Sequence, residues 1–245
     1  MTDTENKAVI SEWQVINLRL TTFYDDTMPL QFKQNEWFRE VAGEDAETTI
    51  TRRDLFQQEG NFGEGRLILG MPAMTIPQRV DWFYVSPTGL GNPFDNLENA
   101  ISKFVPIMNK WLESSFDTMR IGLGSVSLLP AKDKESANKQ LASYLLAVKL
   151  EPDSSDFLYH INHPRRSKTP VEGLDINRLS KWMVSLSSEI GLSTASVRKN
   201  FSCLLETDMN TSAQYQGNLP KNHYAAILNE LVTLTQEIVE KGDVK

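Results

Sequence analysis

The spacing of apolar residues changes repeatedly between a two-residue and a helical period, and the order of these changes constrains the fold most. Between 12 and 24, apolar side chains fall on both alternating faces, which predicts a strand in the middle of a sheet. From Asp95 to about Ser114, apolar residues recur every three or four positions, which predicts a long helix capped by Asp95. Pro106 lies inside it and predicts a bend. The same reasoning predicts strands at 12–24, 48–57, 66–69, 79–85, 119–129, 156–162, 176–189 and 197–209, and helices at 35–41, 95–114, 133–148 and from 220 to about 240.

These elements follow the order βαβββα twice, which defines the expected fold class. We expect an α+β fold in which antiparallel sheets carry long helices on one face. The chain, 1–245, would form a single domain with pseudo-halves at approximately 10–115 and 117–243, joined edge to edge. The two halves show no residue-level similarity, so coincidence of order stays an alternative to duplication. No strand-to-helix phosphate loop is visible, so a nucleotide-binding α/β fold is not expected.

Composition and charge narrow the class of protein. The chain is 40% hydrophobic with a formal net charge of −7, which favours a folded protein and argues against coating nucleic acid through bulk charge. No apolar run approaches the roughly 18 to 20 residues that cross a bilayer. The polar residues 1–7 do not resemble a secretory signal, and one cysteine allows no intramolecular disulfide. We therefore expect a cytoplasmic protein without membrane contact, in which Cys203 is a buried apolar residue rather than a reactive thiol.

Two histidines near residue 160 could suggest a metal site, but their spacing argues against one. His160 and His163 are an odd number of residues apart, so on a strand they would point to opposite faces. His160 and Asn162, by contrast, share a face. We interpret His160 and Asn162 as a candidate pair of polar residues in a binding groove.

A basic turn follows this strand and is a second candidate for binding. Arg165 and Arg166 lie in it, and Arg178 and Lys181 are close in sequence. Guanidinium groups bind phosphate or carboxylate well, and long loops such as 162–174 are often functional. The alternative is a solvated loop whose charges balance the many acids of the chain.

Three polar residues near the end of the last strand form a candidate metal site. Glu206, Asp208 and Asn210 alternate, so their side chains project from one face of a strand. Two carboxylates and an amide could bind a divalent cation for metal-assisted hydrolysis. The alternative is that Asp208 and Asn210 simply belong to a turn.

Aromatic residues near residue 83 are candidates for a partner surface. Trp82 and Tyr84 share one face of a predicted strand and Phe83 lies on the other, so one of these two sets could be exposed. An exposed aromatic pair on a sheet would mark a ligand cleft or a partner surface. Because partner surfaces are enriched in aromatic residues, Trp82 and Tyr84 are kept as binding candidates.

The glycines near residue 123 do not form a nucleophile elbow. Gly122 and Gly124 lie beside Ser125, but the Gly-x-Ser-x-Gly spacing is absent. We expect these two glycines to let a crossing helix approach the sheet.

The later half of the chain resembles a sporadically distributed bacterial family of uncharacterised proteins found among mobile or defence genes. The similarity rests on Met119-Arg120-Ile121-Gly122-Leu123, on Asn177-Arg178-Leu179 and on Glu206-Thr207-Asp208-Met209-Asn210-Thr211, followed by a long final helix. The resemblance implies a bacterial cytoplasmic origin and an accessory role. It implies no catalytic residue.

Together these patterns predict a non-catalytic binding or accessory protein of a bacterial cytoplasmic system, with defence as one setting. We expect it to engage a protein partner through its sheet face or long loops. A homo-oligomer is a second possible assembly, and no cofactor is expected. One alternative is a metal-dependent hydrolase that uses Glu206 and Asp208. Another is a small-ligand carrier with a pocket between the sheet and the final helix.

Overall fold

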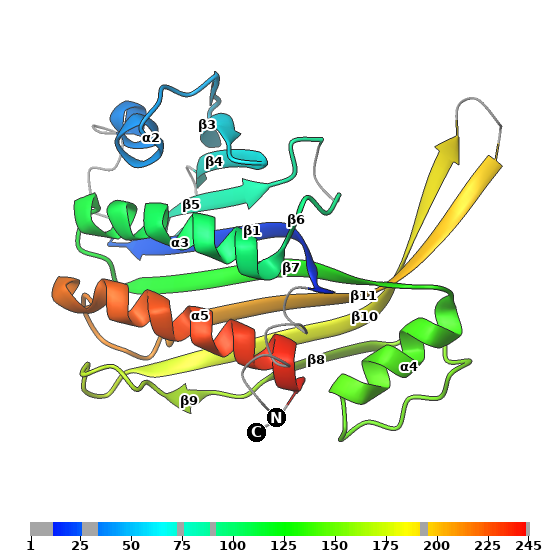
Figure 1. The fold of residues 1–245 in the computed structure, drawn as a ribbon. Coiled ribbons are helices and arrows are strands. Elements are labelled where there is room, and N and C mark those ends of the chain that lie inside the picture. Colours follow the sequence, from blue (N-terminus) through cyan, green and yellow to red (C-terminus); the bar gives the residue numbers. More distant parts are fainter. Residues whose placement is uncertain (1–11, 26–33, 73–75, 89–91, 192–195, 244–245) are drawn as a thin grey trace.

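The computed structural model describes residues 12–25, 34–72, 76–88, 92–191 and 196–243. All strand pairs in this part of the chain are antiparallel and form one sheet, and helices accompany it, which confirms the α+β class (Figure 1). The strands are β1 (Gln14–Tyr24), β2 (Thr48–Thr51), β3 (Leu55–Phe62), β4 (Gly65–Pro72), β5 (Gln78–Val85), β6 (Asp95–Asn96), β7 (Arg120–Ala131), β8 (Leu158–Asn162), β9 (Arg165–Arg166), β10 (Asp175–Gly191) and β11 (Ser196–Thr211). The helices are α2 (Gln34–Ala42), α3 (Leu97–Ser114), α4 (Lys134–Tyr144) and α5 (Tyr224–Lys241), with a 3-10 turn, η2 (Lys221–His223), before α5.

The strand order places β1 and β7 in the middle of the sheet. From one edge to the other the order is β2-β3-β4-β5-β1-β7-β11-β10-β8, with β6 beside β1 and β9 beside β10. Strand β1 is therefore paired along both of its edges, with β5 on one side and β7 on the other, as predicted for a strand in the middle of a sheet.

Helices α2, α3 and α4 contact residues that lie on the same side of the sheet. The ring of Phe38 in α2 lies 6.1 Å from that of Trp82, and the ring of Trp111 in α3 lies 5.7 Å from it. In α4 the carbonyl oxygen of Ala137 accepts a hydrogen bond from the Cys203 thiol at 3.3 Å. The strand register puts Trp82 and Cys203 on one side, which we call the helix face. The opposite side is called the open face.

The helix face holds the hydrophobic core. All five tryptophans are buried, and they pack edge-to-face in pairs such as Trp37 with Trp111 at 5.0 Å. Such aromatic pairs contribute roughly 0.5 to 1.5 kcal/mol each beyond the free energy of burying their area. Helix α5 lies beside α3 and contacts β7 and β11 (Figure 1). Its buried side chains are Tyr224, Ile227, Leu228, Leu231, Leu234, Thr235, Ile238 and Val239. The apolar side chains of this set belong to the hydrophobic core.

Helix α3 begins close to the predicted position. The Asn96 side chain, rather than that of Asp95, caps it by accepting a hydrogen bond from the backbone N–H of Asn99 at 2.8 Å. Asp95 instead forms an ion pair with Lys103 at 3.0 Å. Pro106 lies inside α3, which continues past it without a break.

Several predicted elements differ from the structure. The single strand expected at 48–57 is two strands, β2 and β3, because a tight turn places the Arg52 N–H 2.8 Å from the Leu55 carbonyl oxygen. The helix expected at 133–148 ends at Tyr144, and the short strands β6 and β9 were not expected. The middle of each half therefore contains more strands than βαβββα allows.

Cys203 is buried, as its apolar sequence context predicts. Burial raises the pKa of its thiol to about 12, so it stays protonated and unreactive near neutral pH. Among the described helices, none is both long and apolar enough to cross a membrane.

Candidate binding site

A trough with a cavity volume of about 620 Å³ lies on the open face and crosses the middle of the sheet. Cross-strand pairing arranges the side chains along it in two rows. The first row contains Phe83, Arg19, Gly124, Asp208 and Leu179. The second row contains Asn17, Val126, Glu206, Lys181 and His160.

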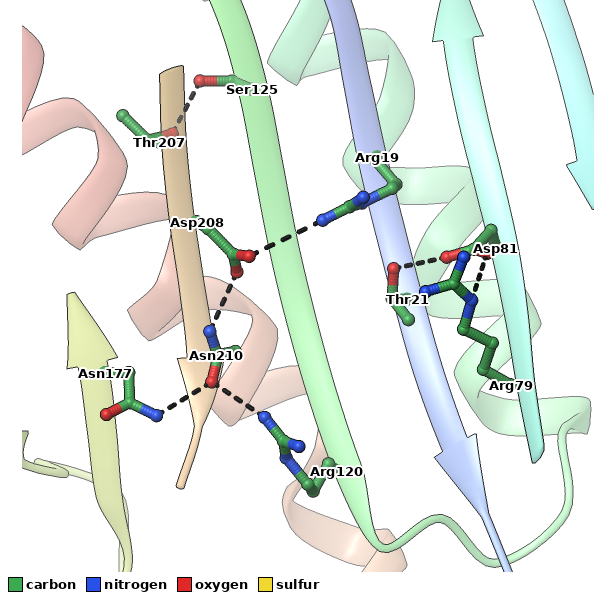
Figure 2. A network of polar contacts seen from close by, with 10 residues as sticks. All are labelled: Arg19, Thr21, Arg79, Asp81, Arg120, Ser125, Asn177, Thr207, Asp208 and Asn210. Carbon is green, nitrogen blue, oxygen red and sulfur yellow. Dashed lines mark hydrogen bonds and ion pairs between the residues drawn. The ribbon is translucent and has the colours of Figure 1, made fainter. Parts of the chain in front are cut away.

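Gly124 is the residue that allows charges on distant strands to meet. It pairs with Arg19 of β1 on one side and with Asp208 of β11 on the other. Because Gly124 has no side chain, the guanidinium of Arg19 extends across β7 and lies 3.6 Å (Nη2 to Oδ2) from the Asp208 carboxylate (Figure 2). A Cβ atom at position 124 would lie 3.5 Å from Arg19 Nε. Gly122 and Gly124 were expected to let a helix approach the sheet, but this prediction is wrong. Both face the open side, where Gly124 makes room for Arg19 and Gly122 makes room for Asn210.

Asn210 fixes the orientation of the Asp208 carboxylate. Its Nδ2 donates to Asp208 Oδ1 at 2.9 Å, and its Oδ1 accepts from Asn177 Nδ2 and Arg120 Nη2, each at 3.0 Å (Figure 2). Gly122 leaves space for this amide, since a Cβ there would lie 3.3 Å from the Asn210 Cβ. A hydrogen-bonded amide with partners on three strands has one preferred orientation, so Asp208 is held in place.

Arg120 supports this network from β7. Its guanidinium lies 4.8 Å from the centre of the Phe23 ring, and its Nε donates to the carbonyl oxygen of Thr211 at 3.1 Å. Partial burial lowers the pKa of Arg120, and the nearby Asp208 opposes this effect. Arginine nevertheless stays charged in proteins, so Arg120 is a fixed cation beside the trough.

A second ion pair lies in the other row. Lys181 Nζ lies 2.9 Å from Glu206 Oε1, and both side chains are about a third exposed. His160 follows at the β8 end of the same row and is exposed. The acids of β11 thus form a stripe with Arg19 on one side and Lys181 on the other.

A third polar group lies beside the trough between β1 and β5. The Thr21 hydroxyl donates to Asp81 Oδ1 at 2.6 Å, and Arg79 Nε lies 3.0 Å from Asp81 Oδ2 (Figure 2). The Asp81 carboxylate is almost fully buried, and these two partners compensate its charge.

The candidate metal residues share a face as predicted, but they are arranged as ion pairs. Glu206 is bound to Lys181, and Asp208 to Arg19 and Asn210. Throughout the described residues, no group of three or more His, Cys, Asp or Glu side chains could hold a metal ion. A divalent cation would have to displace two positive side chains, so the geometry favours a polar network here.

Of the two polar candidates of β8, His160 lines the trough and Asn162 lies beside a lining residue, whereas Arg165 and Arg166 of the basic turn do not line it. His160 lines the second row, and Asn162 lies next to Leu179, with its Oδ1 accepting from the Arg178 backbone N–H at 2.9 Å. Asn162 also donates to Asn177 Oδ1 at 3.1 Å, which links β8 to the Asn210 network.

The three candidate arginines of the basic region lie in surroundings that indicate a role in stabilising the fold. Arg165 forms an ion pair with Glu237 of α5 at 2.8 Å, and Arg166 forms one with Asp175 at 3.2 Å. Arg178 is 1% exposed, and burial lowers its pKa, with a further lowering from Arg165. These residues therefore do not form one phosphate-binding cluster with the trough. The ion pair of Arg165 links the 163–178 region to α5, and the ion pair of Arg166 is formed within that region.

The aromatic binding candidates were assigned to the wrong face. Trp82 and Tyr84 are fully buried on the helix face, so they cannot form an exposed pair. On this side the rings of Phe38 in α2 and Trp111 in α3 pack against Trp82. Phe83, on the opposite face of the same strand, is the aromatic residue that lines the trough.

Three residues of the network around Asp208 and Asn210 were missed by sequence reasoning: Arg19, Arg120 and Asn177. A signal for Arg19 was available, because it is the one charged residue of the central strand β1. Such a residue either faces a binding surface or has a buried partner. Its partner, Asp208, lies far along the chain and could not be paired with it without the strand register.

Comparisons with known proteins show no family for this chain. No family model matches it, and no curated protein matches it. Among solved structures, the crystal structure of DynU16, a protein in the dynemicin biosynthetic locus, aligns with 93% of this chain and 99% of its own. The identity is 9% and the TM-score is 0.21, so the two chains are not shown to share a fold.

Proposed function

We propose that this protein is a non-catalytic binding protein that holds a segment of a partner protein in the trough on its open sheet face. The observation that carries the proposal is the trough itself, in which apolar Phe83 and Leu179 stand at either side of exposed charge pairs. A mixture of an aromatic anchor, apolar walls and oriented charges is typical of protein-binding surfaces.

The chemistry of the trough supports binding rather than catalysis. Ser125 and Thr207 lie on the central strands β7 and β11, but their hydroxyl groups point to the helix face, where they are buried and hydrogen-bonded to each other at 2.7 Å. They are not presented to a substrate as nucleophiles. Glu206 and Asp208 are each paired with a cation, which disfavours a role as general base.

The proposal can be tested with a displayed library of random peptides. We expect enriched peptides to bind the wild-type chain and to lose binding to Gly124→Leu, because the leucine side chain would fill the floor of the trough. Thr48→Leu adds the same side chain to the exposed edge strand β2 and should leave binding unchanged. Enrichment that is insensitive to Gly124→Leu would place binding elsewhere and contradict the proposal.

A metal-dependent hydrolase is the second candidate, favoured by the two carboxylates of β11 that face the trough. It predicts that magnesium or manganese raises the melting temperature and that Asp208→Ala abolishes the increase. The binding proposal predicts no such metal-dependent shift, so thermal unfolding with and without each ion separates the two functions.

We also propose a bacterial cytoplasmic setting with an accessory, defence-related role. Support comes from the resemblance carried by 119–123, 177–179 and 206–211. Co-purification from the native host should return a stoichiometric protein partner, and recovery of the chain alone would count against an accessory role.

Finally, we propose that the chain consists of two related halves with their long helices on one face. Support comes from the strand order, in which each half contributes its first strand to the middle of the sheet, β1 or β7, and its last long strand, β5 or β11, next to it. Helices α3 and α5, which follow β5 and β11, have the same length of 18 residues. A circularly permuted chain that starts at residue 117 should fold if the halves are equivalent units.

A further inference from the structure

The trough is long and narrow enough to hold a short extended peptide that crosses the strands of the sheet. It runs across the strands from Phe83 on β5 to His160 on β8, over the strands β5, β1, β7, β11, β10 and β8. With neighbouring strands about 4.8 Å apart, the trough is about 24 Å long, and its two rows make it about 7 Å wide. An extended chain that rises about 3.3 Å per residue crosses it with roughly seven residues.

The order of chemical groups along this line is fixed by the strand order. An aromatic ring on β5 is followed by the Arg19 guanidinium, which extends from β1 over Gly124 of β7, and then by the Glu206 and Asp208 carboxylates on β11. Although β1 and β11 are two strand spacings apart, the Arg19 guanidinium extends over β7 to within 3.6 Å of the Asp208 carboxylate, so the two charges lie close together. In an extended peptide, side chains two residues apart share a face and lie about 7 Å apart, so this is the spacing that fits the pair.

The Arg19–Asp208 ion pair is open to a further partner. Its contact of 3.6 Å is long, and the two side chains are 36% and 45% exposed. Exposed pairs of this kind contribute little to stability, and a guanidinium has five N–H donors, more than this contact uses. A ligand with a single charge would satisfy one member of the pair and draw it away from the other. A ligand that carries both charges would compensate both members.

We propose that the partner segment binds as an extended peptide with an acidic and a basic side chain two residues apart, so that both project from the same face of the peptide. The acidic side chain lies over Arg19 and the basic one over Asp208 and Glu206. An apolar residue beyond the acidic one packs on Phe83. The inference rests on the proposed binding function and adds the chemistry of the bound segment.

An array of short immobilised peptides tests the spacing. Each peptide carries one phenylalanine, one glutamate and one lysine among glycine and serine residues, with glutamate and lysine separated by one to five positions. Both chain directions are included, and in half of the peptides the order of glutamate and lysine relative to phenylalanine is reversed. We expect the strongest wild-type binding when glutamate lies nearer to phenylalanine and lysine follows two positions away, with a preference of about fivefold over the reversed order.

A charge-swapped protein provides the decisive comparison. The double variant Arg19→Asp with Asp208→Arg keeps an ion pair, because Gly124 leaves the same gap for an arginine that extends from β11 towards β1. This variant should fold as the wild type does, which circular dichroism and thermal unfolding check. We expect it to prefer the reversed order, with lysine nearer to phenylalanine, by a similar factor.

The possible results separate this inference from the proposed function. Binding that Gly124→Leu abolishes, but that shows no preference for spacing or order, would overturn the charge assignment and leave the binding function standing. An unchanged order preference in the charge-swapped variant would overturn it as well. If no array peptide binds in a Gly124-dependent way, while library selection does return such peptides, the charge assignment is also wrong. If neither probe finds Gly124-dependent binding, the proposed function fails.

Discussion

The two faces of this sheet use neighbouring residues for opposite purposes. On β5, Trp82 is fully buried against α2 and α3, whereas the next residue, Phe83, lines the trough on the open face. The helix face is filled with apolar side chains, and the open face has charge pairs arranged around a glycine floor. The comparison indicates that the helix face supplies most of the stability, which leaves the open face free to present polar groups.

The largest expected difference in the free energy of unfolding is between variants of the two aromatic neighbours, Trp82 and Phe83. We expect Trp82→Ala to lower the free energy of unfolding by about 3 to 5 kcal/mol, because it leaves a cavity among packed rings. Phe83→Ala removes a half-buried ring and should cost about 1 kcal/mol or less. Urea unfolding monitored by circular dichroism measures both, and Trp82→Phe serves as a milder variant if Trp82→Ala does not fold. Equal costs would contradict the assignment of stability to the helix face.

Two glycines provide the next comparison. A Cβ at Gly65 would lie 2.6 Å from the Val85 carbonyl oxygen and 2.7 Å from the Tyr84 ring, so Gly65→Ala should cost about 1 to 3 kcal/mol. At Gly124 the nearest atoms would be 3.5 Å away, which is ordinary contact. Gly124→Ala should therefore leave stability unchanged or raise it by up to about 1 kcal/mol. A large loss at Gly124 in the same urea experiment would show that the trough floor is as tightly packed as the helix face.

The buried thiol of the helix face predicts a pH dependence. Burial raises the pKa of Cys203 from 9.0 to about 12, so the folded chain keeps the proton while the unfolded chain releases it. The resulting stabilisation is complete below pH 9 and is lost as pH rises towards 12, with a decrease of about 1 kcal/mol between pH 8 and 10. Unfolding measured across this range should show a smaller decrease for Cys203→Ala. An identical slope in the two proteins would assign the effect to other groups.

The smallest expected effect concerns the ion pair across Gly124. Because Arg19 and Asp208 are exposed to solvent, a double-mutant cycle with alanine at each position should give a coupling free energy of about 0.2 to 1 kcal/mol. The coupling should decrease at high salt, since ions screen exposed charges. A coupling that is larger and independent of salt would mean that the pair is part of the structural core rather than a binding surface.

Much of the fold could be predicted because its elements have strong periodicity. The long helix α3 and the central strand β1 were expected within a few residues of their observed bounds, since each buries regularly spaced apolar side chains. The turn between β2 and β3, formed by Arg52-Arg53-Asp54, was missed because it contains neither glycine nor proline, the residues that most clearly mark a turn. The short strand β9 was missed because it consists of two arginines, which carry no strand pattern.

The site was predicted only in part, for a reason that lies in tertiary structure. Alternation shows that Glu206 and Asp208 share a face and that Trp82 and Phe83 do not, but it does not show which face the helices cover. The pairing of Arg19 with Asp208 depends on the order of three strands and on a glycine between them. None of these facts is local, so sequence reasoning found the acids of the trough and not their partner on β1.

The most direct test of the two-face account is a two-dimensional amide NMR titration with a peptide selected from the library. We expect the signals of trough residues such as Gly124, Lys181 and His160 to shift as the peptide is added. The indole signals of all five tryptophans, which are buried, should not change. Shifts confined to α5 and the tryptophan indoles, with Gly124 unaffected, would contradict the account, because the partner would then bind on the helix face.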